Sequence, residues 1–339
     1  MFPVLASGEA DPDKNFVDIS VGPAAWIGLG VILLLLLGID LYRHREAHVP
    51  TFAESAKESL FWVACGFTFS GFIWYAYGTD AFSEYIVGYL VEKSLSVDNV
   101  FVWSMLFSSM AIPVKYQHRV LFWGIFGALT LRAIFILGAT ELLQQFDWLF
   151  LLFGGFLVFT GIRMMRHTED EGDHSSSSAL KLLGRVMPVS EELDGQKFLT
   201  VQNGVRVATP LLAALVVVEA TDVVFALDSV PAILGVTQDP YLVLSSNAFA
   251  ILGLRAMYFL LADARDRFHY LNHALGIILI FVGLKMAALW QDWHLPGGAW
   301  SSLAVIAVLL LGAIYFSERR VRQEAKSAAE ENLVDAPTE

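Results

Sequence analysis

The stretch from residue 209 to residue 235 is apolar but carries three carboxylates, a combination that could bind a cation. It reads TPLLAALVVVEATDVVFALDSVPAILG and exceeds the length of about 20 residues that crosses a bilayer. Glu219, Asp222 and Asp228 lie within it, and no Lys, Arg or His accompanies them. Because a charged side chain at the centre of a membrane helix costs roughly 2.5–3.5 kcal/mol, we expect these acids to bind metal cations or protons. The alternative interpretation is that each acid is protonated or hydrogen-bonded for packing alone.

A second acidic stretch, EYIVGYLVEKSLSVDNVFVW, covers residues 84–103. In a helix Glu92 and Asn99 share one face, whereas Asp98 lies well round from Glu92. Glu84 is expected near the outer end of this helix, in solvent or at the membrane interface. The candidate metal ligands of the whole chain are Glu92, Asp98, Asn99, Glu219, Asp222, Asp228 and Asn247. Such oxygen donors suit Mn²⁺, Ca²⁺ and Mg²⁺, whereas Cu and Zn prefer thiolate and imidazole ligands.

The composition is that of a membrane protein. Of 339 residues, 56% are hydrophobic and only 17% are charged, whereas average soluble proteins are about a quarter charged. The net charge of −12 gives no reason to expect nucleic-acid binding. The single cysteine excludes a disulfide framework within the chain and a cysteine-based metal motif. The sequence has no P-loop motif and no histidine-supported nucleophile near the acids, so we expect neither an ATP-driven pump nor an enzyme, and no tightly bound cofactor.

Nine hydrophobic stretches are long enough to span a bilayer, which predicts an all-α, polytopic membrane protein. The predicted spans are 22–42, 57–77, 82–110, 119–138, 146–164, 209–235, 240–261, 271–290 and 299–317. Together they form a transmembrane domain over residues 22–317, between an extracytoplasmic tail at 1–21 and a cytoplasmic tail at 318–339. Lys and Arg gather in alternate loops and in the C-terminal tail, while the opposite side holds only Lys14. The positive-inside rule then puts the N-terminus outside and the C-terminus in the cytoplasm, across the cell inner membrane.

The long connection at residues 165–208 is expected in the cytoplasm. Its first half, HTEDEGDHSSSS at 167–178, is polar and low in complexity, which favours a solvated linker over a regulatory metal sensor. Its second half contains KFLTVQNGVRVA, in which two β-prone runs flank Asn203-Gly204. This dipeptide suits a tight turn, so we expect a small β-hairpin before residue 209.

Three segments recur in the same order, which indicates an internal repeat. The matched segments are VDNVFVW with TDVVFAL, FGALTLRAIFIL with FAILGLRAMYFL, and FTGIRMM with FVGLKMA. They pair Asp98 with Asp222 and Arg132 with Arg255, and all three offsets lie between 122 and 124 residues. The two arginines either neutralise carboxylates or anchor helices through backbone carbonyl groups. Lys93 either tethers Glu92 or extends to the membrane interface.

Each copy of the repeat, residues 82–164 and residues 209–290, has three spans. Because three is odd, the second copy enters the membrane from the opposite side, which makes the repeat inverted. Inverted repeats of secondary transporters carry their ion sites near the midplane, so Asp98 and Asp222 are expected to face each other there. Pro231 removes a helical hydrogen bond, so we expect local unwinding that either returns Asp228 to the site or leaves it as a second station or gate.

The acidic motifs resemble those of a known family. VEKSLSVDNVFVW together with VEATDVVFALDSVPAILGVT is similar to the TerC family of bacterial membrane proteins, in particular its Alx-like members. KFLTVQNGVRVATP and SSNAFAILGLRAMYFLL resemble the same family, and the likeness covers residues 20–320. The family is associated with tellurite resistance by name and with manganese export by function. The resemblance implies that the transported metal is bound by Glu92, Asp98, Glu219, Asp222 and Asp228.

These patterns predict a secondary transporter that exports a divalent metal, with Mn²⁺ as the first choice, by alternating access between the two repeats. Exchange for protons is chemically compatible with clustered carboxylates, and the direction of transport follows only from the resemblance. One alternative is a non-transporting membrane factor that loads metal into exported proteins or organises a tellurite-resistance complex. Another is a carrier of Ca²⁺. The expected partners are the metal ion and the lipid bilayer, while the sequence does not indicate any protein partner.

Overall fold

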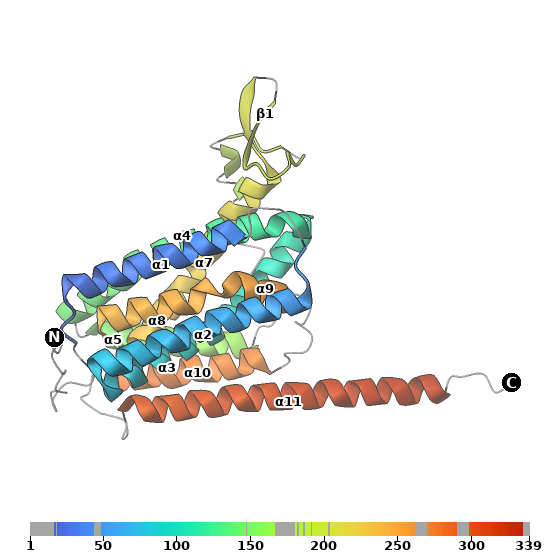
Figure 1. Ribbon diagram of the computed structural model, residues 1–339. Coiled ribbons are helices and arrows are strands. Elements are labelled where there is room, and N and C mark those ends of the chain that lie inside the picture. The colour runs from blue at the N-terminus through green and yellow to red at the C-terminus, as the bar shows by residue number, and fades with distance from the viewer. Residues whose placement is uncertain are drawn as a thin grey trace.

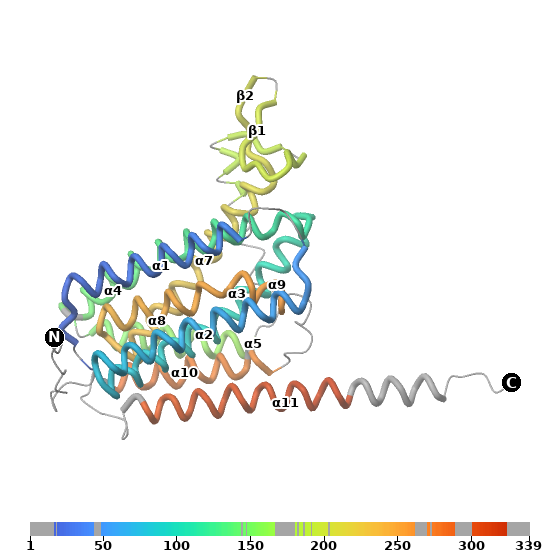
Figure 2. Tube along the Cα trace, in the orientation of Figure 1, coloured from blue at the N-terminus to red at the C-terminus, as the bar shows by residue number. Residues whose placement is uncertain are grey.

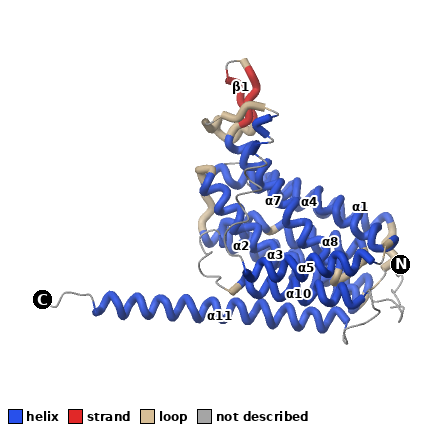
Figure 3. Tube along the Cα trace, turned by 180° about the vertical axis from the view of Figure 1, so that it is seen from behind, coloured by secondary structure: helices blue, strands red, loops and turns tan. Residues whose placement is uncertain are grey.

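The computed structural model is a bundle of helices from which one β-hairpin projects (Figure 1). Seen from behind, the bundle is helical throughout and the strands are confined to the projection (Figure 3). The described residues are 17, 19–43, 49–146, 148–166, 180–181, 183–185, 187–190, 192–202, 204–261, 270–289 and 298–334. The 167–178 run, predicted as a solvated linker, lies outside them.

Every predicted span coincides with a helix or with a pair of helices. The helices are α1 (Pro23–Arg43), α2 (Phe52–Tyr77), α3 (Thr79–Ser109), α4 (Val114–Gln145), α5 (Trp148–Arg166), α7 (Pro210–Leu234), α8 (Pro240–Leu252), α9 (Leu254–Leu261), α10 (Leu271–Leu289) and α11 (Gly298–Val334). The last of these runs along one side of the bundle and continues beyond it, as the tube trace makes clear (Figure 2).

Within the described part of the chain, six helices are long and apolar enough to cross a membrane individually. The bent pair α8–α9 passes the same test of length and apolar composition when its two helices are taken together, as a broken span or a re-entrant loop. α3 has 31 residues but carries Glu84, Glu92, Lys93 and Asp98 along its length. α10 has 19 residues, the same length as α5, and includes the apolar segment His273–Ala288. Its charged residues therefore set α3 apart from the other long helices, and both α3 and α10 pack inside the bundle.

The helix that was predicted as one span over 240–261 is broken. α8 and α9 meet at Gly253 with a bend of 41°. An added Cβ at Gly253 would lie 2.7 Å from Cβ of Trp62, so α2 approaches the break too closely for any side chain. By contrast, α7 continues through Pro231 as a single helix to Leu234, so the predicted unwinding at that proline is wrong. Pro231 lacks the N–H that would donate to the carbonyl of Leu227, but the helical backbone continues without that hydrogen bond.

α5 and α10 pack along each other through glycines. An added Cβ at Gly154 would lie 2.6 Å from the carbonyl oxygen of Gly283, and one at Gly161 would lie 2.5 Å from that of Gly276. In the proposed repeat, Gly154 corresponds to Gly276 and Gly161 to Gly283. A two-fold exchange of the repeats would therefore turn one glycine contact into the other. The same exchange would turn the packing of α3 on α8 into that of α7 on α4, and both packings occur.

The predicted β-hairpin is confirmed. β1 (Leu199–Gln202) pairs with β2 (Val205–Ala208) in antiparallel register, with Gln202 opposite Val205. Gly204 in the turn has φ of +78°, a left-handed conformation that glycine adopts at little steric cost. Asn203 lies outside the described residues. The hairpin leads directly into Thr209, whose hydroxyl donates to the carbonyl oxygen of Lys197 at 2.7 Å before α7 begins.

The segment before α1 binds two acids at the end of the bundle where α3 and α8 begin. The backbone N–H of Val17 donates to Oε1 of Glu84 at 2.9 Å, and that of Ile19 donates to Oδ2 of Asp239 at 3.2 Å. Asp239 also caps α8 through its other oxygen. Glu84 is only 5% exposed, so the prediction that solvent surrounds it is wrong, while its place at the membrane interface stays a prediction. The backbone amide supplies the hydrogen bond that solvent was expected to provide.

Candidate cation site

The centre of the bundle holds a buried arginine between two acids from different helices. The guanidinium of Arg132, on α4, donates to Oε1 of Glu92 on α3. Its second terminal nitrogen donates to Oδ1 of Asp222 on α7 at 3.3 Å. Nη1 also reaches Oγ of Ser229 at 3.0 Å, two turns further along α7. Three helices are therefore tied together by one cation and its partners.

Burial and charge make this cluster unusual. Glu92, Arg132 and Asp222 are each no more than 1% exposed. Two carboxylates face one guanidinium, so with all three groups ionised the cluster carries an excess negative charge. Oε2 of Glu92 and Oδ2 of Asp222 are buried and have no hydrogen-bond partner. Since a buried carboxylate oxygen without a partner is costly, these two atoms indicate a place where a further cation or proton would be stabilised.

Glu219 lies one helical turn before Asp222 on the same face of α7. Its carboxylate occupies the space beside Gly127 of α4, where even a methyl group would overlap it. Glu219 is half-buried. Gly127 therefore permits a third acidic side chain to lie next to the central cluster, and it is a residue that the sequence did not single out.

The other predicted ligands are spread over the surrounding helices. Asp228 is half-buried and accepts a hydrogen bond at 3.2 Å from the hydroxyl of Thr160 on α5. Asp98 is half-buried, and Asn99 is buried on α3. Asn247 is 1% exposed on α8, and its amide nitrogen has no hydrogen-bond partner. Among the described residues, no three Asp, Glu, His or Cys side chains are arranged to hold a metal ion.

The contacts decide between the interpretations of the basic residues. Arg132 neutralises carboxylates, as one of the two interpretations held. Lys93 donates to the carbonyl oxygen of Ala250 on α8 at 3.0 Å, so it neither tethers Glu92 nor extends to the interface. Ser229 was missed by the sequence reasoning, although its position seven residues after Asp222 puts it on the same helical face. That spacing was the available signal.

A helical bundle with spans of this kind and acids sealed within it defines an integral, multi-pass membrane protein. The sequence model described as "Integral membrane protein TerC family" matches residues 77–326. The chain therefore belongs to the TerC family, as its acidic motifs predicted.

The relatives agree with this assignment over nearly the whole chain. An uncharacterised membrane protein of Myxococcus xanthus, STKORF319, is 45% identical over 313 residues, which cover 92% of this chain and 97% of the relative. The Alx protein of Shigella flexneri, whose name proposes a membrane-bound redox modulator, is 43% identical over 81% of this chain and 88% of its own length. A membrane protein of Rickettsia bellii is 39% identical over 86% of this chain and 96% of its own length. No solved structure matches the chain significantly.

Proposed function

We propose that the protein is a secondary transporter that exports a divalent cation, Mn²⁺ in the first place, through the acids around Arg132. The observation that carries this proposal is the pair of buried carboxylates, Glu92 and Asp222, whose second oxygens have no hydrogen-bond partner. A purely structural ion pair would be balanced in charge, because unpaired buried charge is strongly destabilising. An excess of acid in the middle of a membrane bundle suits a protein whose cargo supplies the missing charge.

Arg132 then has a specific part in the mechanism. Its guanidinium fills the position between Glu92 and Asp222, which is where a divalent cation would gain most from both carboxylates. A cation can bind there only if Arg132 moves aside. The two positive groups thus compete for the same acids, and Arg132 keeps them paired when the cargo has left. Glu219, beside Gly127 and one turn before Asp222 on the same face of α7, would be the third oxygen ligand.

The inverted repeat supplies the movement that transport requires. If the two repeats exchange conformations, the site opens to the opposite face of the membrane while the acids stay near the midplane. The reciprocal glycine contacts between α5 and α10 are compatible with such an exchange. We propose that helices 3–5 and 6–8 of the nine predicted spans are these repeats, and that they rock against each other. Asp98 and Asn99 would contribute from repeat one, and Asp228 and Asn247 would line the path from repeat two.

The choice of cargo follows from ligand chemistry and from the family resemblance. Carboxylate and amide oxygens are hard donors that suit Mn²⁺, Ca²⁺ and Mg²⁺. The association of the TerC motifs with manganese export selects Mn²⁺ and the outward direction. We further propose the inner membrane, with the N-terminus outside and the C-terminus in the cytoplasm, from the positions of the Lys and Arg residues.

A second candidate function is a non-transporting membrane factor, in metal loading of exported proteins or in a resistance complex. The name of the Alx relatives favours this second candidate, because it describes a redox modulator and mentions no transported substrate. The two candidates differ in one respect that can be measured. A transporter moves metal in a bilayer without other proteins, whereas a partner-dependent factor does not.

The deciding experiment measures Mn²⁺ entry into proteoliposomes that contain the purified protein and an internal Mn²⁺-sensitive dye. Saturable entry is expected for the wild type, and its loss is expected for Asp222→Asn. Asp80→Asn is the matched control, because Asp80 is an exposed carboxylate in the first turn of α3 and should leave entry unchanged. If the rate of Mn²⁺ entry also depends on an imposed pH gradient, the transporter exchanges Mn²⁺ for protons. Entry that survives Asp222→Asn in a folded protein would refute the proposed site, and no flux of any divalent cation would favour the second candidate.

A further inference from the structure

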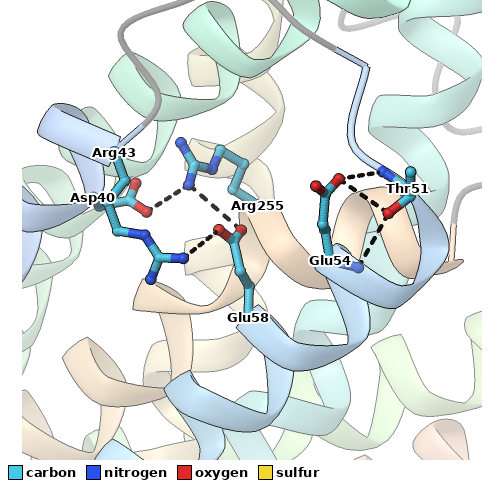
Figure 4. Close-up of polar contacts among 6 residues, drawn as sticks. All are labelled: Asp40, Arg43, Thr51, Glu54, Glu58 and Arg255. Carbon is cyan, nitrogen blue, oxygen red and sulfur yellow. Dashed lines mark hydrogen bonds and ion pairs between the residues drawn. The ribbon is translucent and has the colours of Figure 1, made fainter.

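A second buried charge cluster lies where α1 ends and α2 begins (Figure 4). Nη2 of Arg255, on α9, is 2.6 Å from Oδ1 of Asp40 on α1 and 3.9 Å from Oε2 of Glu58 on α2. Glu58 is also 3.4 Å from the guanidinium of Arg43, at the end of α1. Arg255 is 3% exposed and Asp40 is 8% exposed, so this part of the cluster is shielded from water. Three helices again meet at one arginine.

Asp40 and Arg255 each lie at the end of their own helix where the helix dipole disfavours their charge. Asp40 lies in the last turn of α1, where the negative end of the helix dipole disfavours an acid. Arg255 is the second residue of α9, where the positive end disfavours a cation. Neither charge therefore stabilises the helix that carries it. What stabilises each is the other, across the boundary between α1 and α9.

Charge balance separates this cluster from the central one. Among the residues that the structure describes, two acids, Asp40 and Glu58, face two arginines, Arg255 and Arg43. The central cluster instead sets Glu92 and Asp222 against Arg132 alone. A balanced cluster has no excess charge to attract a cation, so the peripheral cluster fastens helices together and does not bind cargo.

The position of Arg255 connects this fastening to the proposed movement. Arg255 is the counterpart of Arg132 in the repeat, but its acids lie on α1 and α2, outside both repeats. Asp40 and Glu58 also precede the segment that the family sequence model matches, residues 77–326. Arg255 follows the break at Gly253 by two residues, so it belongs to the short helix beyond the 41° bend. α9 packs on α2 and on α3, the helix that carries Glu92.

We propose that the Asp40–Glu58–Arg255 cluster is a latch by which α1 and α2 hold the half-helix α9 closed over one end of the cation path. The latch rests on the transport function proposed above, since a latch matters only if α9 moves. Release of Arg255 lets α9 swing about Gly253 and admits water to the face of α3 that bears Glu92. In the proposed orientation this is the cytoplasmic end, where the cargo enters.

A thiol introduced on that face reports opening directly. Ser96 is fully buried one turn after Glu92, toward the end of α3 that lies beside the latch. Cys65 is the only native cysteine, so Ser96→Cys in a Cys65→Ala background carries a single thiol. Its rate of reaction with a membrane-impermeant maleimide, added to inside-out vesicles, measures access from the latch end.

The expected result is slow labelling in the parent and labelling about tenfold faster in Asp40→Asn, within the range of coupling energies seen for contacting residues. Glu54→Gln is the matched control. Its carboxylate lies one turn before Glu58 and caps α2 with Thr51, a role that glutamine can fill (Figure 4). Arg255→Gln should accelerate labelling as Asp40→Asn does. The double variant, which leaves no unpaired charge, should add nothing further because one contact is already lost.

Several outcomes overturn the latch. Unchanged labelling in Asp40→Asn refutes it, and so does a double variant whose acceleration equals the product of the two single effects. The labelling assay uses no metal, so it separates the two proposals. If the latch variants accelerate labelling but the wild type shows no Mn²⁺ flux, the transport proposal is refuted and the latch is retained. If the wild type transports Mn²⁺ but the labelling rate is the same in all variants, the latch is refuted and the transport proposal is retained.

Discussion

Replacement of Arg132 by glutamine tests whether a cation can substitute for its guanidinium. The substitution leaves Glu92 and Asp222 buried without their counter-charge. Removing one partner of a buried ion pair typically costs about 3–5 kcal/mol. For a chain of this size about 2 °C of melting temperature corresponds to 1 kcal/mol, so the apparent melting temperature should fall by roughly 6–10 °C.

Mn²⁺ should reverse much of that loss in the variant. If the ion binds between the two freed carboxylates, a concentration one hundred times its dissociation constant stabilises the folded protein by about 2.7 kcal/mol. In the wild type the gain is smaller, because the ion must first displace Arg132. The assay is thermal unfolding in detergent micelles, followed by tryptophan fluorescence at fixed protein concentration over a Mn²⁺ titration.

Arg255→Gln provides the control for this prediction. It also removes a buried arginine from two acids, and its apparent melting temperature should fall as well. Arg43 still neutralises Glu58, so this variant frees one carboxylate where Arg132→Gln frees two, and Mn²⁺ should restore less of its stability. Equal rescue of the two variants, or a Mn²⁺ effect on Arg132→Gln no larger than on the wild type, would refute the idea that arginine and cargo compete for one position.

Two further predictions concern packing and the hairpin. Gly154→Val should lower the apparent melting temperature by the equivalent of about 1–3 kcal/mol, because the new Cβ would lie 2.6 Å from a carbonyl oxygen on α10. Gly155→Val is the control. Its Cβ would meet nothing within 4 Å, so the melting temperature should not change. Hydrogen bonds from Thr200 and Lys197 hold the pKa of Asp194 below its usual value. A lowered folded-state pKa contributes stability that is present above the unfolded-state pKa and is lost as the pH falls through the folded-state pKa. Thr200→Val should therefore move the Asp194 titration, followed by carboxyl NMR shifts, to higher pH, and an unchanged titration would contradict this account.

The helices were predictable because each is a local property of the sequence. A run of about 20 apolar residues has few alternatives to a membrane helix, and an Asn-Gly pair between β-prone runs has few alternatives to a hairpin. Glu92, Asp222 and Arg132 were also accessible, since charge in an apolar run is visible without a structure. The class of the fold and the centre of the candidate site therefore follow from short segments.

The features that escaped prediction depend on contacts between distant segments. Glu84 is buried because the backbone of Val17 reaches it, and no local pattern announces that contact. The partner of Arg255 is Asp40, 215 residues away. Residue 253 has no room for a side chain because Trp62, again on another helix, lies too close. Each of these outcomes is decided by which helices become neighbours.

The glycine contacts between α5 and α10 have a consequence for the origin of the chain. The contact of Gly154 with Gly283 and that of Gly161 with Gly276 exchange under the two-fold relation that we propose for the repeats. In each helix the two glycines are seven residues apart, so they lie on one face two turns apart. An interface in which residue i meets j while j meets i is isologous, the form that two identical subunits make. The seam between α5 and α10 is therefore built like the contact surface of a homodimer whose subunits lay antiparallel in the membrane. Duplication of one three-helix gene, followed by fusion of the two copies, would leave this arrangement within a single chain.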